Sequence, residues 1–168
     1  NSGATERALQ LIALITVLSL APAILIMVTS FTRIVVVLSL LRSAIGTPSA
    51  PPNMIIVSLA LFLTAFIMAP TGKLIYSNAV SPLLAGTITA DVAIERASGP
   101  LRTFMLSQVR EKDLALFLDM SGEPRPASPD VTPLTALIPA FMISELRRAF
   151  EIGFLLLMPF LIIETLFS

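Results

Sequence analysis

Long apolar runs separated by short polar segments set the first expectations for this chain. Residues 8–32 carry no charged side chain, and beyond Arg33 the apolar run continues to Leu41. A single helix over 8–41 would be about 50 Å long at 1.5 Å per residue, which exceeds the roughly 30 Å hydrocarbon layer of a membrane. Because Pro22 removes a backbone donor inside this run, we expect a kink or two stacked half-helices there.

A proline-rich connector follows the first run and predicts a hairpin. The connector, residues 46–53, contains three prolines, which cannot continue a helix. Its last residues are typical of the first turn of a new helix: Pro51, Pro52 and Asn53. The uncharged run after it predicts a returning helix over 54–69 that ends at Pro70 and Gly72. We therefore expect an N-terminal helical hairpin over residues 1–72.

Charged residues concentrate in residues 73–133, which are expected to form a small helical insertion that faces water. Residues 98–100 (Ser-Gly-Pro) predict a helix start. After it, side chains recur at helical spacing on one face: Leu101, Phe104, Met105, Gln108 and Val109. A run of mixed charge at 110–113 precedes a second apolar run at 114–120. Residues 123–133, with four prolines, are expected to be an extended linker.

The last apolar segment, residues 134–168, has four charged residues near its centre: Glu145, Arg147, Arg148 and Glu151. Four central charges exposed to lipid would cost about 10 kcal/mol on insertion scales. Their spacing of three or four residues allows partial neutralisation within the helix, and full compensation requires neighbouring helices. Three helix-disrupting residues further predict broken helices packed within protein: Pro139, Gly153 and Pro159.

Composition supports an all-α membrane protein and restricts its chemistry. Hydrophobic residues make up 55% of the chain and charged residues 13%, with a mean hydropathy of +0.90, so the chain is far more apolar than a soluble domain. Eleven basic and eleven acidic residues leave no overall charge that would attract nucleic acid. The absence of Cys and His removes thiolate and imidazole ligands and His-dependent catalysis. We expect no enzyme activity, no cofactor and no metal site.

The charged residues also suggest an orientation and an alternative function. Arg33 and Arg42 flank the first hairpin, so the positive-inside rule predicts a cytoplasmic connector and a periplasmic insertion. Acids within apolar segments suit a proton carrier, and the candidates are Glu145, Glu151 and Glu164. A second hypothesis is therefore a small-solute or ion transporter that uses Glu151 as its proton site. A third hypothesis, an adaptor for a membrane enzyme, has no specific residue to support it.

Several stretches resemble the FliP family of flagellar export-gate proteins and its injectisome relatives. They are TSFTRIVVVLSLLRSAIG at 29–46, PPN at 51–53, LALFLTAFIMAP at 59–70, REKDLALFL at 110–118 and LIPAFMISELRRAFEIGFLLLMPFLIIE at 137–164. Together they cover more than half of the chain in the family's order and spacing. The stretch at 110–118 resembles the flagellar branch in particular.

This resemblance implies a subunit of the bacterial inner membrane, in the flagellar basal body. Copies of such a subunit form a ring, expected to be a pentamer, which FliQ- and FliR-like subunits complete. The ring passes unfolded export substrates, and assembly lifts the subunits partly above the bilayer. After the position of Glu164 the family continues with an acidic residue and a methionine-rich helix, so the resemblance assigns no gating methionine to residues 1–168.

Thirteen residues are the candidate site residues, all with structural roles. Four are expected to pack between helices or subunits: Glu145, Arg147, Arg148 and Glu151. Four more form either a solvated charged face or an intersubunit salt-bridge patch: Arg110, Glu111, Lys112 and Asp113. The remaining five define the hairpin and its topology: Arg33, Arg42, Pro51, Pro52 and Asn53.

Overall fold

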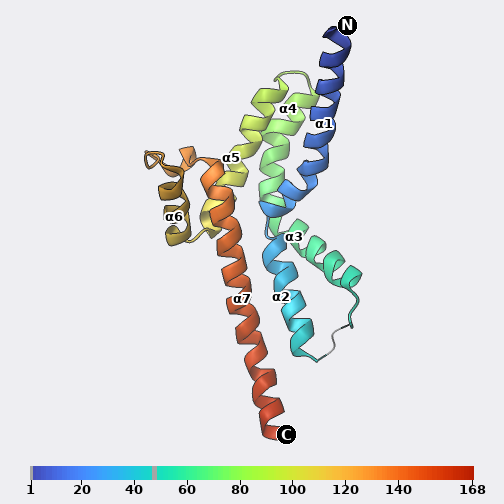
Figure 1. Ribbon diagram of the computed structural model, residues 1–168, viewed down its shortest axis with the longest axis vertical. Coiled ribbons are helices and arrows are strands. Elements are labelled where there is room, and N and C mark those ends of the chain that lie inside the picture. Colours follow the sequence, from blue (N-terminus) through green and yellow to red (C-terminus); the bar gives the residue numbers. More distant parts are fainter. Residues whose placement is uncertain (1, 47–48) are drawn as a thin grey trace.

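The computed structural model describes residues 2–46 and 49–168, and all regular structure within these ranges is helical (Figure 1). The main helices are α1 (Ser2–Met27), α2 (Phe31–Ala44), α3 (Asn53–Ile75), α4 (Ser81–Leu84), α5 (Ala90–Gln108), α6 (Glu111–Ser121) and α7 (Leu134–Phe167). A π-helical segment, Tyr76–Val80, joins α3 to α4, and a short 3-10 turn, Pro129–Val131, precedes α7. The expected all-α fold with helical hairpins is confirmed.

The first apolar run forms two helices, but the break between them does not lie at Pro22. Pro22 is inside α1, and the chain leaves the helical conformation at residues 28–30. At this break the Thr29 hydroxyl donates to the Ile26 carbonyl at 2.9 Å and accepts from the Phe31 N–H at 3.4 Å. The alternative of two half-helices divided at Pro22 was wrong, because a proline removes one intrahelical bond whereas Thr29 gives two backbone groups another partner. The kink at Pro22 stays a prediction.

The hairpin between α2 and α3 forms as expected, and the two helices are in contact. Within the connector, Thr47 and Pro48 lie outside the described residues. The returning helix, however, does not end at Pro70 and Gly72, because α3 runs through both residues to Ile75. Contacts of α5 with α3 and the π-helical segment, where Ala79 is buried, offset the hydrogen bond that Pro70 removes.

The insertion contains α4, α5 and α6, and α5 begins earlier than its sequence predicts. α5 starts at Ala90 and has Pro100 inside it, so the expected start at 98–100 was wrong. Its first half is held by packing against α3 and the π-helical segment, with Ala93 buried. α6 ends at Gly122, whose φ of +69° is the left-handed conformation that glycine adopts without strain. The linker after it is irregular, as expected, apart from the 3-10 turn.

The main core lies where α5, α6 and α7 meet the break between α1 and α2. Its buried side chains are Val28, Met105, Leu137 and Phe141. The predicted apolar face of α5 contributes Leu101 and Phe104 to the surrounding contacts, and Val109 follows directly after the helix. The rings of Phe104 and Phe141 pack edge to face with centroids 5.9 Å apart. The amphipathic pattern of α5 is therefore confirmed even though its start is not.

The last apolar segment is one continuous helix, so the prediction of broken helices there was wrong. α7 runs through Pro139, Gly153 and Pro159. An apolar helix has no water with which to satisfy a freed carbonyl, so continuing past a proline is the favourable option. Figure 1 shows the C-terminal part of α7 extending beyond every other helix, with the N-terminal half of α1 at the opposite end of the molecule.

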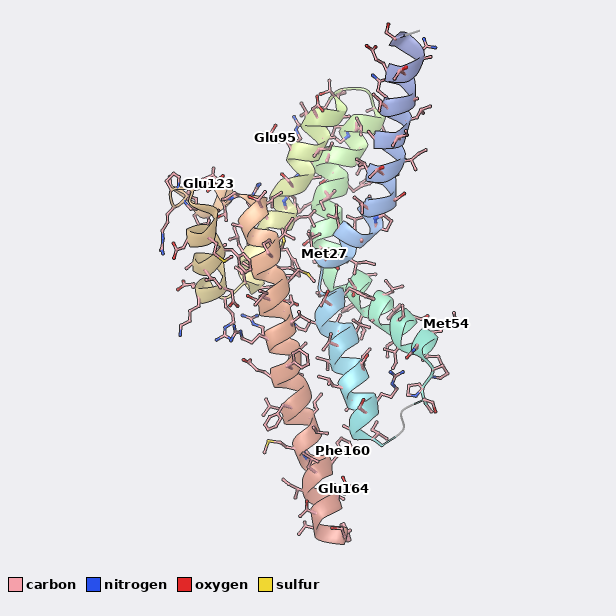
Figure 2. All side chains as sticks on the ribbon, viewed as in Figure 1. Met27, Met54, Glu95, Glu123, Phe160 and Glu164 are labelled. Carbon is pink, nitrogen blue, oxygen red and sulfur yellow. The ribbon has the colours of Figure 1, made fainter. Side chains whose placement is uncertain are left out.

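Within residues 2–46 and 49–168, three helical segments are long and apolar enough to cross a membrane: α1, Asn53–Leu84 and α7. No residue of α1 is buried within the chain. In Figure 2 the labelled Phe160 and Glu164 lie on the free part of α7, whereas Met27 lies where α1 approaches α2 and α3. Most of the apolar surface of these segments therefore remains uncovered by the chain itself.

Candidate functional site

The centre of α7 meets α2 at a buried ion pair. The Arg33 guanidinium of α2 donates through Nη2 to the Glu145 carboxylate of α7, and Glu145 is 1% exposed. The same Nη2 donates to the side-chain oxygen of Gln108 on α5 at 3.1 Å. Oε2 of Glu145 and Nε of Arg33 are buried without a hydrogen-bond partner. One guanidinium nitrogen of Arg33 therefore makes both contacts, and these contacts join α2, α5 and α7.

A second polar contact fixes α6 against α7. Asp113 is 5% exposed and accepts from the Ser144 hydroxyl at 2.8 Å and from Arg147 Nη2 at 3.3 Å. The Ser144 oxygen in turn accepts the backbone N–H of Arg110 at 3.0 Å. Arg110 is the residue between α5 and α6, so this hydroxyl holds the turn that starts α6. The two remaining members of the charged run, Glu111 and Lys112, are exposed on α6.

The other two central charged residues of α7, Arg148 and Glu151, also contact residues outside α7. Glu151 lies 3.5 Å from Arg110 Nη1, and Arg148 donates to the side-chain oxygen of Gln108 at 3.4 Å. Within the described parts of the chain, no ion pair forms among the four central charged residues of α7 themselves. Neutralisation within the helix, which their spacing allows, is therefore not what the structure shows; neighbouring helices of the same chain supply the partners.

Close approach of α2 and α7 makes the Arg33–Glu145 contact possible. A Cβ atom added to Gly153 of α7 would lie 2.4 Å from Leu40 Cδ1 and 3.2 Å from Leu40 Cβ on α2. Only glycine leaves room for Leu40 at this crossing. Gly153 is thus a packing residue two turns below Glu145 on the same helix, where the sequence suggests a helix break.

The hairpin residues predicted from sequence fall into two places. Arg42 Nη1 donates to Oδ1 of Asn53, and the same atom lies 3.4 Å from the carbonyl oxygen of Pro51. Pro52 directly precedes the first residue of α3. Arg33 is not part of this group, because it lies more than two turns away on α2, at the centre of the molecule. The connector and the central charges are therefore separate features.

Two central residues, Gln108 and Ser144, were not singled out as site residues from the sequence. Gln108 accepts hydrogen bonds from two arginines, and Ser144 is fully buried between α6 and α7. The sequence does carry a signal for each. Gln108 is the one polar residue on the apolar face predicted for α5, and Ser144 directly precedes the charged centre of α7.

The chemistry of this central cluster is structural. It contains guanidinium, carboxylate, amide and hydroxyl groups that are bound to one another across α2, α5, α6 and α7. Within the described ranges, no three acidic, His or Cys side chains gather as a group that could hold a metal ion. Such a cluster can fix how helices cross, and it can present charge to another protein chain.

Comparison with known proteins connects this arrangement to one family. The model of the FliP family matches residues 14–168. Proteins named flagellar biosynthetic protein FliP are similar over nearly the whole chain. The protein of Caulobacter vibrioides is 58% identical over 164 residues, which are 98% of this chain and 62% of that protein. The protein of Bacillus subtilis is 50% identical over 155 residues, which are 92% of this chain and 70% of that protein.

A third relative, from Pectobacterium carotovorum, is 50% identical over 155 residues, or 92% of this chain and 60% of that protein. The chain thus spans about three fifths of the length of the Caulobacter and Pectobacterium proteins. The resemblance noted in the sequence is confirmed by these matches, which include the central cluster and the hairpin. With the family model matching from residue 14 to the last residue of the chain, the chain belongs to the FliP family.

Proposed function

We propose that the chain is a non-enzymatic subunit of a flagellar protein export gate in the bacterial inner membrane. In this proposal it assembles with copies of itself, as a pentamer, and with FliQ- and FliR-like subunits. The assembly surrounds a channel through which unfolded flagellar proteins cross the membrane. Membership of the FliP family and relatives named flagellar biosynthetic protein FliP support the flagellar setting.

The observation that carries the assembly proposal is the position of the uncovered apolar surface. α1 and the C-terminal part of α7 lie at opposite ends of the molecule (Figure 1). α1 is about 39 Å long and the whole of α7 about 51 Å at 1.5 Å per residue, against a hydrocarbon layer of roughly 30 Å. One bilayer cannot cover both helices in this arrangement, so protein must cover part of the apolar surface.

Exposure along α1 supports the same conclusion. Its large apolar side chains are exposed on every side, including Leu9 at 62%, Val17 at 63% and Leu25 at 57%. A helix that is apolar all round is surrounded by apolar partners in its working state. Further subunits with apolar helices would provide such surroundings, and they would also raise part of the chain above the bilayer, as the proposal requires.

The proposed orientation follows from the distribution of charge. Arg42 is at the hairpin end of α2, and the connector beyond it is short, which favours a cytoplasmic connector under the positive-inside rule. α5, α6 and the proline-rich linker carry most of the charged residues outside α7. We therefore assign residues 73–133 to the periplasmic side.

The mass of the assembled complex tests this function. The full-length protein, expressed with its neighbouring export proteins, is extracted in a mild detergent and weighed by native mass spectrometry. We expect a complex that contains several copies of this protein and two smaller subunits. Loss of the protein should block secretion of flagellar proteins. A protein that stays monomeric after extraction, with secretion unchanged when its gene is deleted, would rule the proposal out.

A transport assay addresses the second hypothesis, in which Glu151 is a proton site. Glu151 has a side chain that is 60% exposed and lies 3.5 Å from a guanidinium, so it is accessible but already near a cation. The purified protein alone in vesicles is not expected to move solute in response to a proton gradient. Solute uptake that disappears in Glu151→Gln would favour the transporter over the export gate.

A further inference from the structure

The charges at the centre of α7 do not balance within the chain. Glu145 has Arg33, Arg147 has Asp113, and Glu151 has Arg110. Arg148 has no carboxylate within ion-pair distance in the part of the chain that the structure describes, and its hydrogen bond goes to the neutral oxygen of Gln108. A guanidinium at the middle of an apolar helix calls for an anion, which none of the described residues supplies.

Arg148 lies at one end of an apolar face of α7, and no other helix covers this face. Residues on that face recur at spacings of four and three from Arg148: Ile152, Leu155, Pro159 and Ile162. Leu155 is 66% exposed and Ile162 is 54% exposed. An apolar stripe with a charge at one end is suited to another helix that carries the opposite charge at the same height.

Glu151 is the acid that lies at this height. It is three residues from Arg148, which is about 4.5 Å along α7 and about 60° around it. Its side chain is 60% exposed, and its partner Arg110, at 3.5 Å, is itself 37% exposed. Such a surface pair contributes little, so the Glu151 carboxylate is free to accept a second guanidinium.

We propose that Arg148 of one copy pairs with Glu151 of the next copy around the ring. The inference rests on the proposed function, because it needs several copies around one axis. Copies related by rotation about an axis parallel to α7 have the same residue at the same height, so a 4.5 Å offset is within reach of two long side chains. A ring uses two different faces of each subunit, and Arg148 and Glu151 each face one neighbour.

Cysteine cross-linking tests this contact directly, because the chain has no cysteine of its own. Two differently tagged full-length copies are co-expressed, one with Arg148→Cys and the other with Glu151→Cys, and the assembled complex is treated with a bismaleimide that spans the length of the two replaced side chains, because a direct disulfide needs Cα atoms within about 7 Å. We expect a covalent dimer that carries both tags, since neither copy alone holds two cysteines. The matched control pairs Arg148→Cys with Leu146→Cys, which is 37% exposed but lies about 140° from Glu151 around α7, and should give no dimer.

Charge exchange provides the second measurement. Arg148→Glu and Glu151→Arg should each lower the amount of intact complex by about tenfold, and the double variant should restore it. The pairing would be overturned if the complex has its normal mass but shows no 148–151 cross-link. It would also be overturned if the Arg148→Glu variant assembles fully. Either result would leave the proposed export-gate function unaffected. Cross-linking of position 148 only to a smaller subunit or to phospholipid would overturn the pairing as well. Absence of any complex in the unmodified protein would instead contradict the proposed function.

Discussion

Arg33 and Glu145 form the contact on which the centre of the molecule depends most. Glu145 is 1% exposed, and its ion pair with Arg33 is the contact that neutralises it. Taking a carboxylate out of water is costly, so the pair as a whole contributes little, but losing one partner leaves a buried charge uncompensated. The partnerless Oε2 of Glu145 makes the contact still more dependent on Arg33.

We predict that Arg33→Ala lowers the free energy of unfolding by about 3–5 kcal/mol, because Glu145 is left buried and unpaired. Thermal unfolding in detergent, followed by circular dichroism, measures the change. Arg125→Ala is the matched control, since Arg125 and Asp119 are 71% and 69% exposed at 3.9 Å and their pair should contribute less than about 1 kcal/mol. Equal effects of the two substitutions would show that burial of the pair is unimportant.

Ser144 gives a second prediction at this scale. Its hydroxyl donates to Asp113 and accepts the backbone N–H of Arg110, so Ser144→Ala leaves two groups without this partner. We expect a loss of about 1–3 kcal/mol, concentrated in α6. Hydrogen exchange should speed up in α6 and stay unchanged in α2. Thr103→Ala, which removes an exposed hydroxyl bonded to the Gly99 carbonyl within α5, should leave both helices unchanged.

At the residue scale the sequence identified the charges but not their partners. Four central charges in an apolar run are visible without a structure, and so is the need to neutralise them. Which acid meets which arginine depends on how α2, α6 and α7 cross, and Arg33 and Glu145 are 112 residues apart in the chain. The spacing of the charges in α7 favoured ion pairs within that helix, but in the structure the ion pairs form with residues outside α7.

Among the elements, the pairing of α2 with α7 is the contact that positions the central charges. The two helices approach closely at Gly153, where Leu40 occupies the space that a side chain would need. Neither helix is strongly amphipathic by sequence, so small side chains, rather than a hydrophobic seam, determine how near they come. The distance between Arg33 and Glu145 depends on this crossing.

We predict that Gly153→Val lowers the free energy of unfolding by about 1–3 kcal/mol, because its side chain would overlap Leu40. The melting temperature in detergent measures the loss, and adding Leu40→Ala should recover part of it. Gly72→Ala is the control, since nothing lies within 4 Å of its added Cβ atom inside α3. It should leave stability unchanged or raise it slightly. A Gly153→Val protein as stable as Gly72→Ala would contradict the close packing.

Element type was predictable from the sequence, whereas element boundaries often were not. Hydrophobic length and spacing indicated every long helix and the apolar face of α5. Prolines misled in the same direction at Pro70, Pro100 and Pro159, each of which lies inside a helix where the sequence predicted an end, a start or a break. Proline rules derived from helices in water overstate its effect where packing or an apolar environment favours continuing the helix.

For the whole molecule, the separation of its two uncovered ends has a consequence that can be measured. A photoreactive residue placed at Leu18 of α1 and another at Leu161 of α7 both report on the surroundings of exposed positions, at 62% and 46% exposure. We predict cross-links to protein from at least one of the two in the native membrane, because a single bilayer cannot cover both. Exclusive labelling of lipid from both positions would contradict the need for protein partners.

The break between α1 and α2 has one more consequence. Val28 and Ser30 are buried at 3% and 6%, while no residue of α1 is buried. Residues 28–30 are thus held in the core, whereas α1 makes few contacts with the rest of the chain. Folding of the core and docking of the first helix are therefore separable events, and α1 can adopt its final angle late, when neighbouring subunits arrive to meet it.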